Sequence, residues 1–188
     1  SMVRKVGGFS FQELNLGIED IKDTGRVGAD LSYDFINRPA YQHALATADT
    51  EFLRLTLRTS LELGVEPASL VHALQNHDEL TYELVHWANR HHLEHYWFRG
   101  AELTGAELAE TIRADLTTIL TGAQASYNRV FTTNGIACTT ASVIAAAQGF
   151  AQLDSIQESD VDAIRSAHLV LACFNAWQPG VFALSAWD

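Results

Sequence analysis

The chain has 188 residues, of which 47% are hydrophobic, so it is long enough for one domain with a substantial core. Its 12 basic against 23 acidic residues give a net charge of −11, which argues against binding to nucleic acid or to an anionic membrane surface. No run of about 18 uncharged apolar residues and no signal-peptide pattern occurs. The two cysteines, Cys138 and Cys173, form no disulfide framework, so we expect a cytoplasmic protein.

Two segments near the start alternate apolar and polar side chains, as strands with one covered face do. The first covers residues 9–14 and follows the pair Gly7-Gly8, and the second covers residues 29–35. A short helix at 17–24 separates them. The early sequence therefore predicts a strand, a helix and a second strand.

The next segment has helical spacing and then an apolar run. Residues 39–48 and 50–64 are predicted helices, because Pro39 suits a first helical turn and leucines recur at helical intervals. Residues 70–74 are a predicted third strand. From Leu80 the helical pattern resumes, so we expect a helix there.

The second half contains a predicted insertion at 88–136, made of a loop rich in His and aromatic residues, a helix and a polar stretch. That helix, at 104–121, begins with Thr104 as cap and Glu107 three residues later, the pattern of a capping box. Further helices are expected at 137–148 and from about residue 160 to 174, followed by a fourth strand at 181–184.

Strands that alternate with helices favour parallel pairing, because a parallel connection needs a crossover. The sequence therefore predicts one α/β domain over residues 1–188. Active sites of such proteins lie at the carboxyl ends of the strands. The residues expected at these ends are Glu13, Asn15, Asp34, Asn76, His77, Asp78, Glu79 and Ser185.

These polar residues suit chemistry on a sugar. Two carboxylates at neighbouring parallel strand ends can act as an acid and a charge stabiliser at one anomeric centre, and Glu13 and Asp78 are the candidates. His77 and Asn76 can bind sugar hydroxyls through hydrogen bonds. The same residues could instead simply cap the helix that we expect to follow, since Asn and Asp are favoured caps.

Two metal-binding alternatives remain open. His91 and His95 stand four residues apart, a spacing that could hold zinc on one face of a helix, although the pattern lacks the Glu of the familiar metalloprotease motif. A metal-dependent phosphohydrolase could use His77 and Asp78 with His43, His72 or His91. None of these histidines stands in a convincing ligand pattern, so we expect no metal and no cofactor.

The stretch "LVHALQNHDELTYELV" resembles the seventh-strand motif of glycoside hydrolase family thirteen, the α-amylase superfamily, in the form found in trehalose synthases. "FSFQELNLGIEDI" is similar to the fifth-strand motif of that family, "ADLSYDF" to its sixth strand, and "LVLACFNAWQPGVFALSAWD" to its last helix and eighth strand. The resemblance implies a fragment of a (β/α)8 TIM barrel that covers approximately strands five to eight.

The resemblance also implies roles for single residues. Glu13 would be the general acid/base, Asp78 the transition-state stabiliser, and His77 and Asn76 substrate ligands of a retaining enzyme for maltose, trehalose, sucrose or a related α-glucoside. The family's nucleophile belongs to strand four, for which this sequence has no room before Phe9. We therefore expect the isolated chain to be inactive.

Two further expectations follow from the missing strand. The nearest look-alike of the nucleophile motif, Arg113 and Asp115, lies in the predicted helix 104–121, and helical period indicates a solvated helix face for both. A half-barrel exposes sheet edges and an apolar interior, so we expect self-association or pairing with the missing half. A noncatalytic sugar-binding or assembly module is the alternative.

Overall fold

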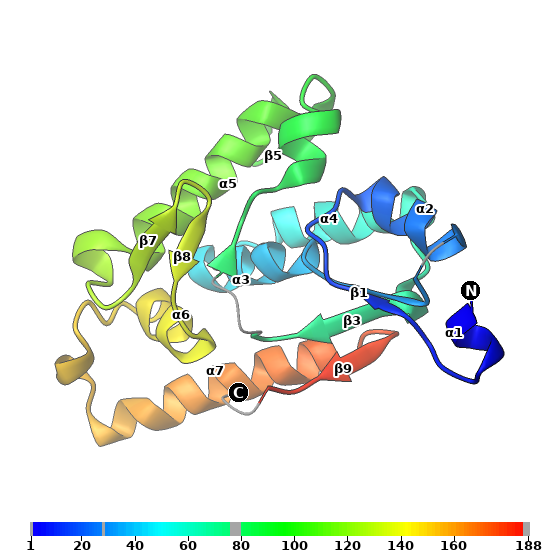
Figure 1. The fold of residues 1–188 in the computed structure, drawn as a ribbon. Coiled ribbons are helices and arrows are strands. Elements are labelled where there is room, and N and C mark those ends of the chain that lie inside the picture. The colour runs from blue at the N-terminus through cyan, green and yellow to red at the C-terminus, as the bar shows by residue number, and fades with distance from the viewer. Residues whose placement is uncertain (1, 28, 76–79, 186–188) are drawn as a thin grey trace.

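Four short strands form one parallel sheet, shown in the computed structural model of Figure 1, which describes residues 2–27, 29–75 and 80–185. The sheet order is β1-β2-β3-β9, and each neighbouring pair is parallel. The α/β class expected from the sequence is therefore confirmed, and all four predicted strands are present but shorter than expected. Their bounds are Phe11–Gln12 for β1, Leu31–Tyr33 for β2, Leu70–Ala73 for β3 and Val181–Ala183 for β9.

Helices connect these strands, as the hydrophobic periods predicted. The connection from β1 to β2 contains one helix, the next contains two, and the last helix leads into β9. An additional short helix, α1, precedes β1. The bounds are Met2–Lys5 for α1, Ile18–Val27 for α2, Asn37–Thr47 for α3, Glu51–Glu62 for α4 and Glu158–Ala176 for α7, with a 3-10 turn, η1, at Pro67–Ser69.

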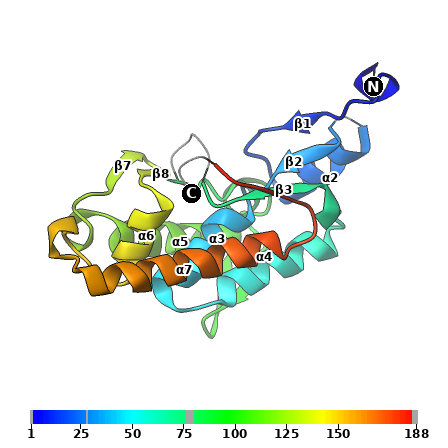
Figure 2. The ribbon, with the colours of Figure 1, turned by 90° about the horizontal axis from the view of Figure 1, so that it is seen from below.

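All of these connecting helices pack against the same face of the sheet. Side chains of a strand alternate between its two faces, so Leu70, His72 and Leu74 point to one side. Leu70 packs against Ile18 of α2 in one apolar cluster, and Leu74 packs against α3 and α7 in another. Figure 2 shows α3, α4 and α7 together below the sheet. The opposite face is free of these helices.

The opposite face and both edges of the sheet carry exposed apolar side chains. The strand register places Phe11, Tyr33, Val71 and Val181 on this face. The central Tyr33 and Val71 are buried, whereas Phe11 on the edge strand β1 is 46% exposed and Val181 on the edge strand β9 is 44% exposed. This face is therefore apolar, and its exposed part lies at the two edge strands.

Residues 80–147 contain more regular secondary structure than we expected for the insertion predicted at 88–136. The core of this region contains α5 (Gly105–Leu120), whose Leu108, Ile112, Leu116 and Leu120 are fully buried. The capping box is confirmed: the Thr104 hydroxyl accepts from the Glu107 backbone at 3.3 Å, and the Glu107 carboxylate accepts from the Thr104 backbone at 2.8 Å. This helix anchors the largest apolar cluster of the described chain.

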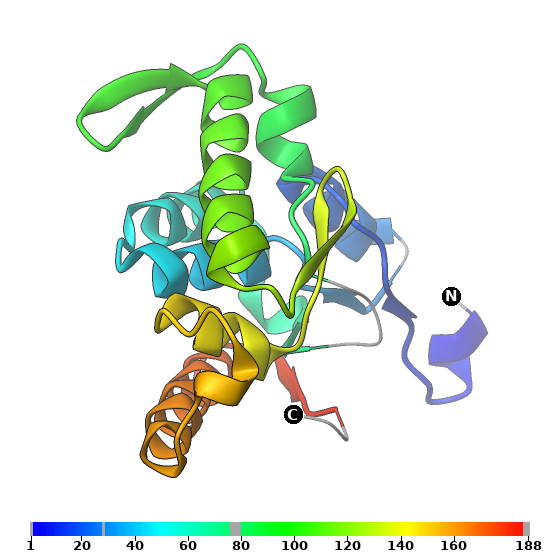
Figure 3. The ribbon, with the colours of Figure 1, turned by 90° about the vertical axis from the view of Figure 1, so that its left-hand side faces the viewer.

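Two secondary-structure predictions in this region were wrong. Residues 80–81 are not helical: β4 (Leu80–Thr81) pairs antiparallel with β8 (Gly135–Ala137), which also pairs with β7 (Arg129–Thr132). The segment predicted as a loop contains the hairpin of β5 (His95–Phe98) and β6 (Ala101–Thr104), which extends beside α5 in Figure 3. The remaining elements are the π-helix η2 (His86–Arg90), the 3-10 turns η3 (Gly122–Gln124) and η4 (Leu153–Ser155), and α6 (Thr140–Ala147).

None of the helices in the described residues combines the length and the apolar character that a membrane crossing requires.

We predict that Ile112→Ala lowers the free energy of unfolding by about 2–5 kcal/mol, because it removes a fully buried side chain and leaves a cavity. Urea denaturation followed by circular dichroism measures this loss. Thr118→Ala, on the exposed face of the same helix, is the matched control and changes the stability by less than about 0.5 kcal/mol. Equal effects of the two substitutions would contradict the assigned core face of α5.

Candidate functional site

The carboxyl ends of the four parallel strands meet at one edge of the sheet, because all four strands run in the same direction. Glu13 directly follows β1, Asp34 directly follows β2, and Leu184 directly follows β9. Glu13 is exposed, and Asp34 is buried. At this edge, the two carboxylates thus have different environments.

The expected adjacency of the strands that bear Glu13 and Asp78 is wrong. Strand β2 lies between β1 and β3, because consecutive strands occupy consecutive places in this sheet. Neighbouring strands are about 4.8 Å apart, so β1 and β3 are about 10 Å apart. In closed barrels, however, inward-pointing side chains from alternate strands share one layer, so this separation is compatible with a shared site.

The other three predicted site residues, Asn76, His77 and Asp78, lie outside the described residues, so their roles stay predictions. The residue before them, Gln75, is fixed by two contacts. Its side-chain oxygen accepts a hydrogen bond from the Thr140 backbone at 2.9 Å, and its carbonyl accepts one from the Ser185 hydroxyl at 2.7 Å. The end of β3 is therefore tied to the start of α6 and to the segment after β9.

A small cavity of about 20 Å³ lies at the same edge. Its walls include Asn15 from the segment after β1, Phe35 from the segment after β2, and Glu83 from the segment after β4. This volume is enough for one water molecule. Sequence reasoning had placed Asn15 at this edge but missed Glu83, because the helix expected from Leu80 gave no reason to bring Glu83 here.

A buried ion pair connects β2, β3 and the start of β9. The His72 Nδ1 lies 3.0 Å from the Asp34 Oδ2, and the His72 Nε2 lies 2.9 Å from the carbonyl oxygen of Pro179. Both partners are acceptors, so both ring nitrogens donate and the imidazole is protonated. Asp34 also accepts hydrogen bonds from the backbone and the side chain of Asn37, at 3.0 and 2.7 Å. The Asp34 carboxylate therefore accepts hydrogen bonds from within the protein and stabilises the fold.

The charge of His72 depends on Asp34. Burial alone lowers the pKa of this imidazole, but the hydrogen bond and negative charge of Asp34, together with the hydrogen bond to the Pro179 carbonyl, outweigh burial, so the pKa of His72 is raised. The pair therefore stabilises the folded state while His72 is protonated. This contribution is complete below the usual pKa of 6.5 and is lost as the pH rises through the raised pKa.

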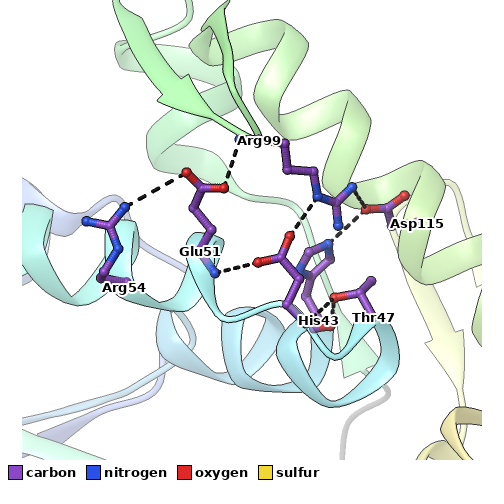
Figure 4. Close-up of polar contacts among 7 residues, drawn as sticks. His43, Thr47, Glu51, Arg54, Arg99 and Asp115 are labelled. Atoms are coloured by element: carbon purple, nitrogen blue, oxygen red, sulfur yellow. Dashed lines mark hydrogen bonds and ion pairs between the residues drawn. The ribbon is translucent and has the colours of Figure 1, made fainter.

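A second polar network joins α3, α5 and the hairpin β5–β6 (Figure 4). The His43 Nε2 lies 2.9 Å from the Asp115 Oδ2, which also accepts from the Arg99 guanidinium at 2.8 Å. Arg99 further donates to the Asp49 carboxylate at 2.8 Å, and its backbone donates to the Glu51 carboxylate at 2.8 Å. The network fixes the hairpin to the turn between α3 and α4.

This network corrects the prediction for the Arg-x-Asp look-alike. Asp115 is not a solvated helix-face residue, because it bonds to the fully buried His43 and to Arg99. Arg113 donates to the backbone carbonyls of Tyr82 and Glu83. Burial lowers the pKa of His43, and the contact with Asp115 only partly offsets this, so a neutral His43 donates to Asp115. Both look-alike residues hold tertiary structure together.

A cluster of charged and imidazole side chains surrounds His91 at the end of η2. The His91 Nε2 lies 3.1 Å from a carboxylate oxygen of Glu19, and its Nδ1 lies 2.7 Å from one of Glu94. The His86 ring stacks on the His91 ring, with 4.1 Å between the centroids. Burial, with a smaller effect of His91, lowers the pKa of His86 to about 4. His91 therefore carries the charge of the imidazole pair, and it connects η2 to α2.

The histidine spacing that suggested zinc does not form a helical pair. His91 directly follows η2 and is engaged by Glu19 and Glu94, whereas His95 begins β5 and is largely exposed. Across residues 2–27, 29–75 and 80–185, no group of three or more His, Cys, Asp or Glu side chains could hold a metal ion. The histidines considered for a phosphohydrolase, His43, His72 and His91, each pair with a carboxylate.

No protein-family model and no curated protein shows a significant match to the chain.

We predict that His72→Gln destabilises the chain by about 3 kcal/mol at pH 6, because it leaves the buried Asp34 carboxylate without its cation. The loss becomes smaller as the pH rises through the raised pKa of His72, because the wild type then loses the same charge. Urea denaturation of both proteins between pH 5 and 9 gives this difference. A stability difference that is independent of pH would contradict the assigned protonated state.

Proposed function

We propose that the chain is part of a retaining enzyme that acts on α-glucosidic bonds, of the trehalose-synthase-like type in glycoside hydrolase family thirteen. The observation that carries the proposal is the parallel sheet β1-β2-β3-β9, in which the four strands stand side by side in the order in which they occur along the chain. Together with helices on one face only, this order supports strands five to eight of a (β/α)8 barrel. The four sequence motifs fall on these four strands in the family's order.

In this proposal, Glu13 protonates the glycosidic oxygen and later activates the accepting water or sugar hydroxyl. Its exposed position directly after β1 leaves it accessible to a substrate. Asp78 stabilises the oxocarbenium-like transition state, and His77 and Asn76 bind sugar hydroxyls. Asp34 is engaged by His72 and Asn37, so it is not a candidate for the acid.

The covalent step of a retaining mechanism needs a nucleophilic carboxylate about 5 Å from the acid. We assign this role to none of the described residues, because Asp115, in the nearest look-alike of the nucleophile motif, is engaged by His43 and Arg99. The proposed enzyme therefore takes its nucleophile from a strand beside β1. The chain by itself binds an α-glucoside but does not cleave it.

We predict that maltose or trehalose binds the chain and that Asp78→Asn weakens this binding about tenfold or more, because a charged acceptor for sugar hydroxyls is lost. Titration calorimetry measures the affinity, with the β-linked cellobiose as ligand control. Asp154→Asn removes an exposed carboxylate elsewhere and leaves the affinity unchanged.

Equal binding of cellobiose and maltose would overturn the proposed α-glucoside specificity. Release of glucose from maltose, measured by a coupled assay, would show that the chain itself supplies the nucleophile and would contradict the proposed division of the catalytic groups.

The exposed apolar edges of the sheet support a further part of the proposal, namely that the chain pairs with a second set of strands or with itself. Phe11 and Val181 are half-exposed apolar residues on the two edge strands. Edge strands with unpaired backbone groups and apolar side chains are the usual sites of such pairing.

We predict that the wild-type chain forms dimers or larger species as its concentration rises and that the double substitution Phe11→Lys and Val181→Lys shifts it to monomers, because it adds charge at both edges. Size-exclusion chromatography with light scattering measures the mass. Val130→Lys changes a similarly exposed residue of β7 and serves as control. A wild-type chain that is monomeric at every concentration would contradict the pairing.

A further inference from the structure

The small cavity at the carboxyl-end edge of the sheet lies between η2 and the segment that joins β1 to α2. This segment, the loop of residues 13–17, begins with the proposed acid. The loop contributes Asn15 and Leu16 to the wall of the cavity, and η2 contributes His86 and Trp87. The position of α2 and its loop relative to η2 therefore determines the shape of this cavity.

Glu19, in the first turn of α2, joins this helix to the end of η2. One of its carboxylate oxygens lies 3.1 Å from the His91 Nε2 and 3.0 Å from a guanidinium nitrogen of Arg90. Arg90 also lies 3.6 Å from the Asp20 carboxylate of α2. The Arg90 side chain is 61% exposed and the His91 side chain only 12%, so solvent screens the His91 contact far less. His91 is therefore the stronger link between the two elements.

The turn that carries His91 is held by α5. The backbone nitrogen of Gly105, at the start of α5, donates to the Glu94 carbonyl at 2.8 Å. A Cβ added to Gly105 would lie 2.3 Å from the His91 carbonyl oxygen, so the two backbones are in direct contact. Because α5 anchors the largest apolar cluster and α2 packs in a smaller one, a change in the contact between His91 and Glu19 displaces α2 rather than His91.

The two contacts of His91 require a proton on each ring nitrogen. The Nε2 faces Glu19, the Nδ1 lies 2.7 Å from a carboxylate oxygen of Glu94, and an ionised carboxylate only accepts hydrogen bonds. A neutral imidazole can donate to just one of them. The stacked His86 adds no competing charge, because burial lowers its pKa to about 4.

The pH at which His91 loses its charge follows from its surroundings. Burial lowers the pKa of the imidazole, but the hydrogen bonds and charges of Glu94 and Glu19 outweigh burial, so the pKa is raised. Both carboxylates have a second partner, since the Tyr96 hydroxyl of β5 donates to Glu94 and Arg90 of η2 contacts Glu19. The charged contact with Glu19 is thus complete below the usual pKa of 6.5 and is lost as the pH rises through the raised pKa.

We propose that His91 acts through Glu19 as a positioning residue for the loop of residues 13–17, and that the proton on His91 controls the position of this loop. Protonated His91 holds the start of α2 against η2, and the loop follows because it leads directly into α2. When the proton is lost, the contact weakens and the loop moves away from η2. The inference rests on the proposed function for one point, namely that the loop carries the acid Glu13.

The test is a nuclear magnetic resonance titration of the chain between pH 5.5 and 9, without sugar. It follows the ring of His91 and the backbone amides of residues 13–17, and we expect both to shift with the same midpoint. Glu19→Gln moves the midpoint of the ring to lower pH and removes the response of the amides, because the contact with α2 has lost its charge. Glu94→Gln is the matched control. It also lowers the midpoint of the ring, but the amides still respond, because Glu94 is not part of α2.

A further variant separates His91 from His72, whose pKa is also raised. His91→Gln removes the response of the amides while His72 still titrates, and circular dichroism checks that the variants are folded. Wild-type amides that do not follow His91, an unchanged response in Glu19→Gln, or an equal loss of response in Glu94→Gln would overturn the proposal. Since no sugar is present, a failure of maltose to bind would contradict the proposed function and would not alter these outcomes.

Discussion

A parallel strand can be joined to its neighbour only by a chain segment that crosses back along the sheet, and in this protein the crossovers all return on the same side. That constraint determines most of the architecture. It gathers the helices on the face of Leu70, His72 and Leu74, and it leaves the face of Phe11 and Val181 without them. It also brings the carboxyl ends of all four strands, and therefore the proposed acid Glu13, to one edge.

The covered face contains a charge, which is unusual for a surface packed against helices. His72 is tolerated there because Asp34 and the Pro179 carbonyl satisfy both of its nitrogens. Through these two bonds the central strand β3 holds the end of β2 and the approach to β9 in fixed positions. The pair thus fixes the edge of the sheet, although neither residue is available to a substrate.

Local sequence patterns predicted the secondary structure correctly in segments whose apolar residues follow a single regular spacing. The alternation in the first two strands, the apolar run of the third, and the stripe and capping box of α5 depend on near neighbours in the sequence, and the structure contains these elements. Leu80, Leu84 and Trp87 have helical spacing and are buried, but Leu84 has a φ of 52°, which an α-helix does not accommodate. The spacing of apolar residues indicates which side chains are buried, but it cannot by itself distinguish a helix from an irregular buried segment.

The hairpin β5–β6 was missed although its sequence carries a signal. Tyr96, Trp97 and Phe98 are residues that strands favour, and Arg99 and Gly100 both have positive φ, at 50° and 75°, as a two-residue hairpin turn requires. Only the glycine is typical of such a turn. Arg99 is held in this conformation by its bonds to Asp49 and Asp115, which lie 50 and 16 residues away in sequence. No local pattern could indicate these contacts.

Asp115 matches the nucleophile motif over three residues but bonds to His43 and Arg99, so such a short match is weak evidence for a nucleophile. The geometry of the sheet indicates where the nucleophile of the proposed enzyme would lie. Retaining enzymes need two carboxyl groups about 5 to 5.5 Å apart. Adjacent parallel strands are about 4.8 Å apart, so a strand added at the open edge of β1 would end beside Glu13 at nearly that separation. β3 is one strand too far for this role and suits a stabiliser instead. Under the proposed function, one added strand beside β1 would therefore account both for the exposed apolar Phe11 of this edge strand and for the nucleophile that no described residue is assigned to supply.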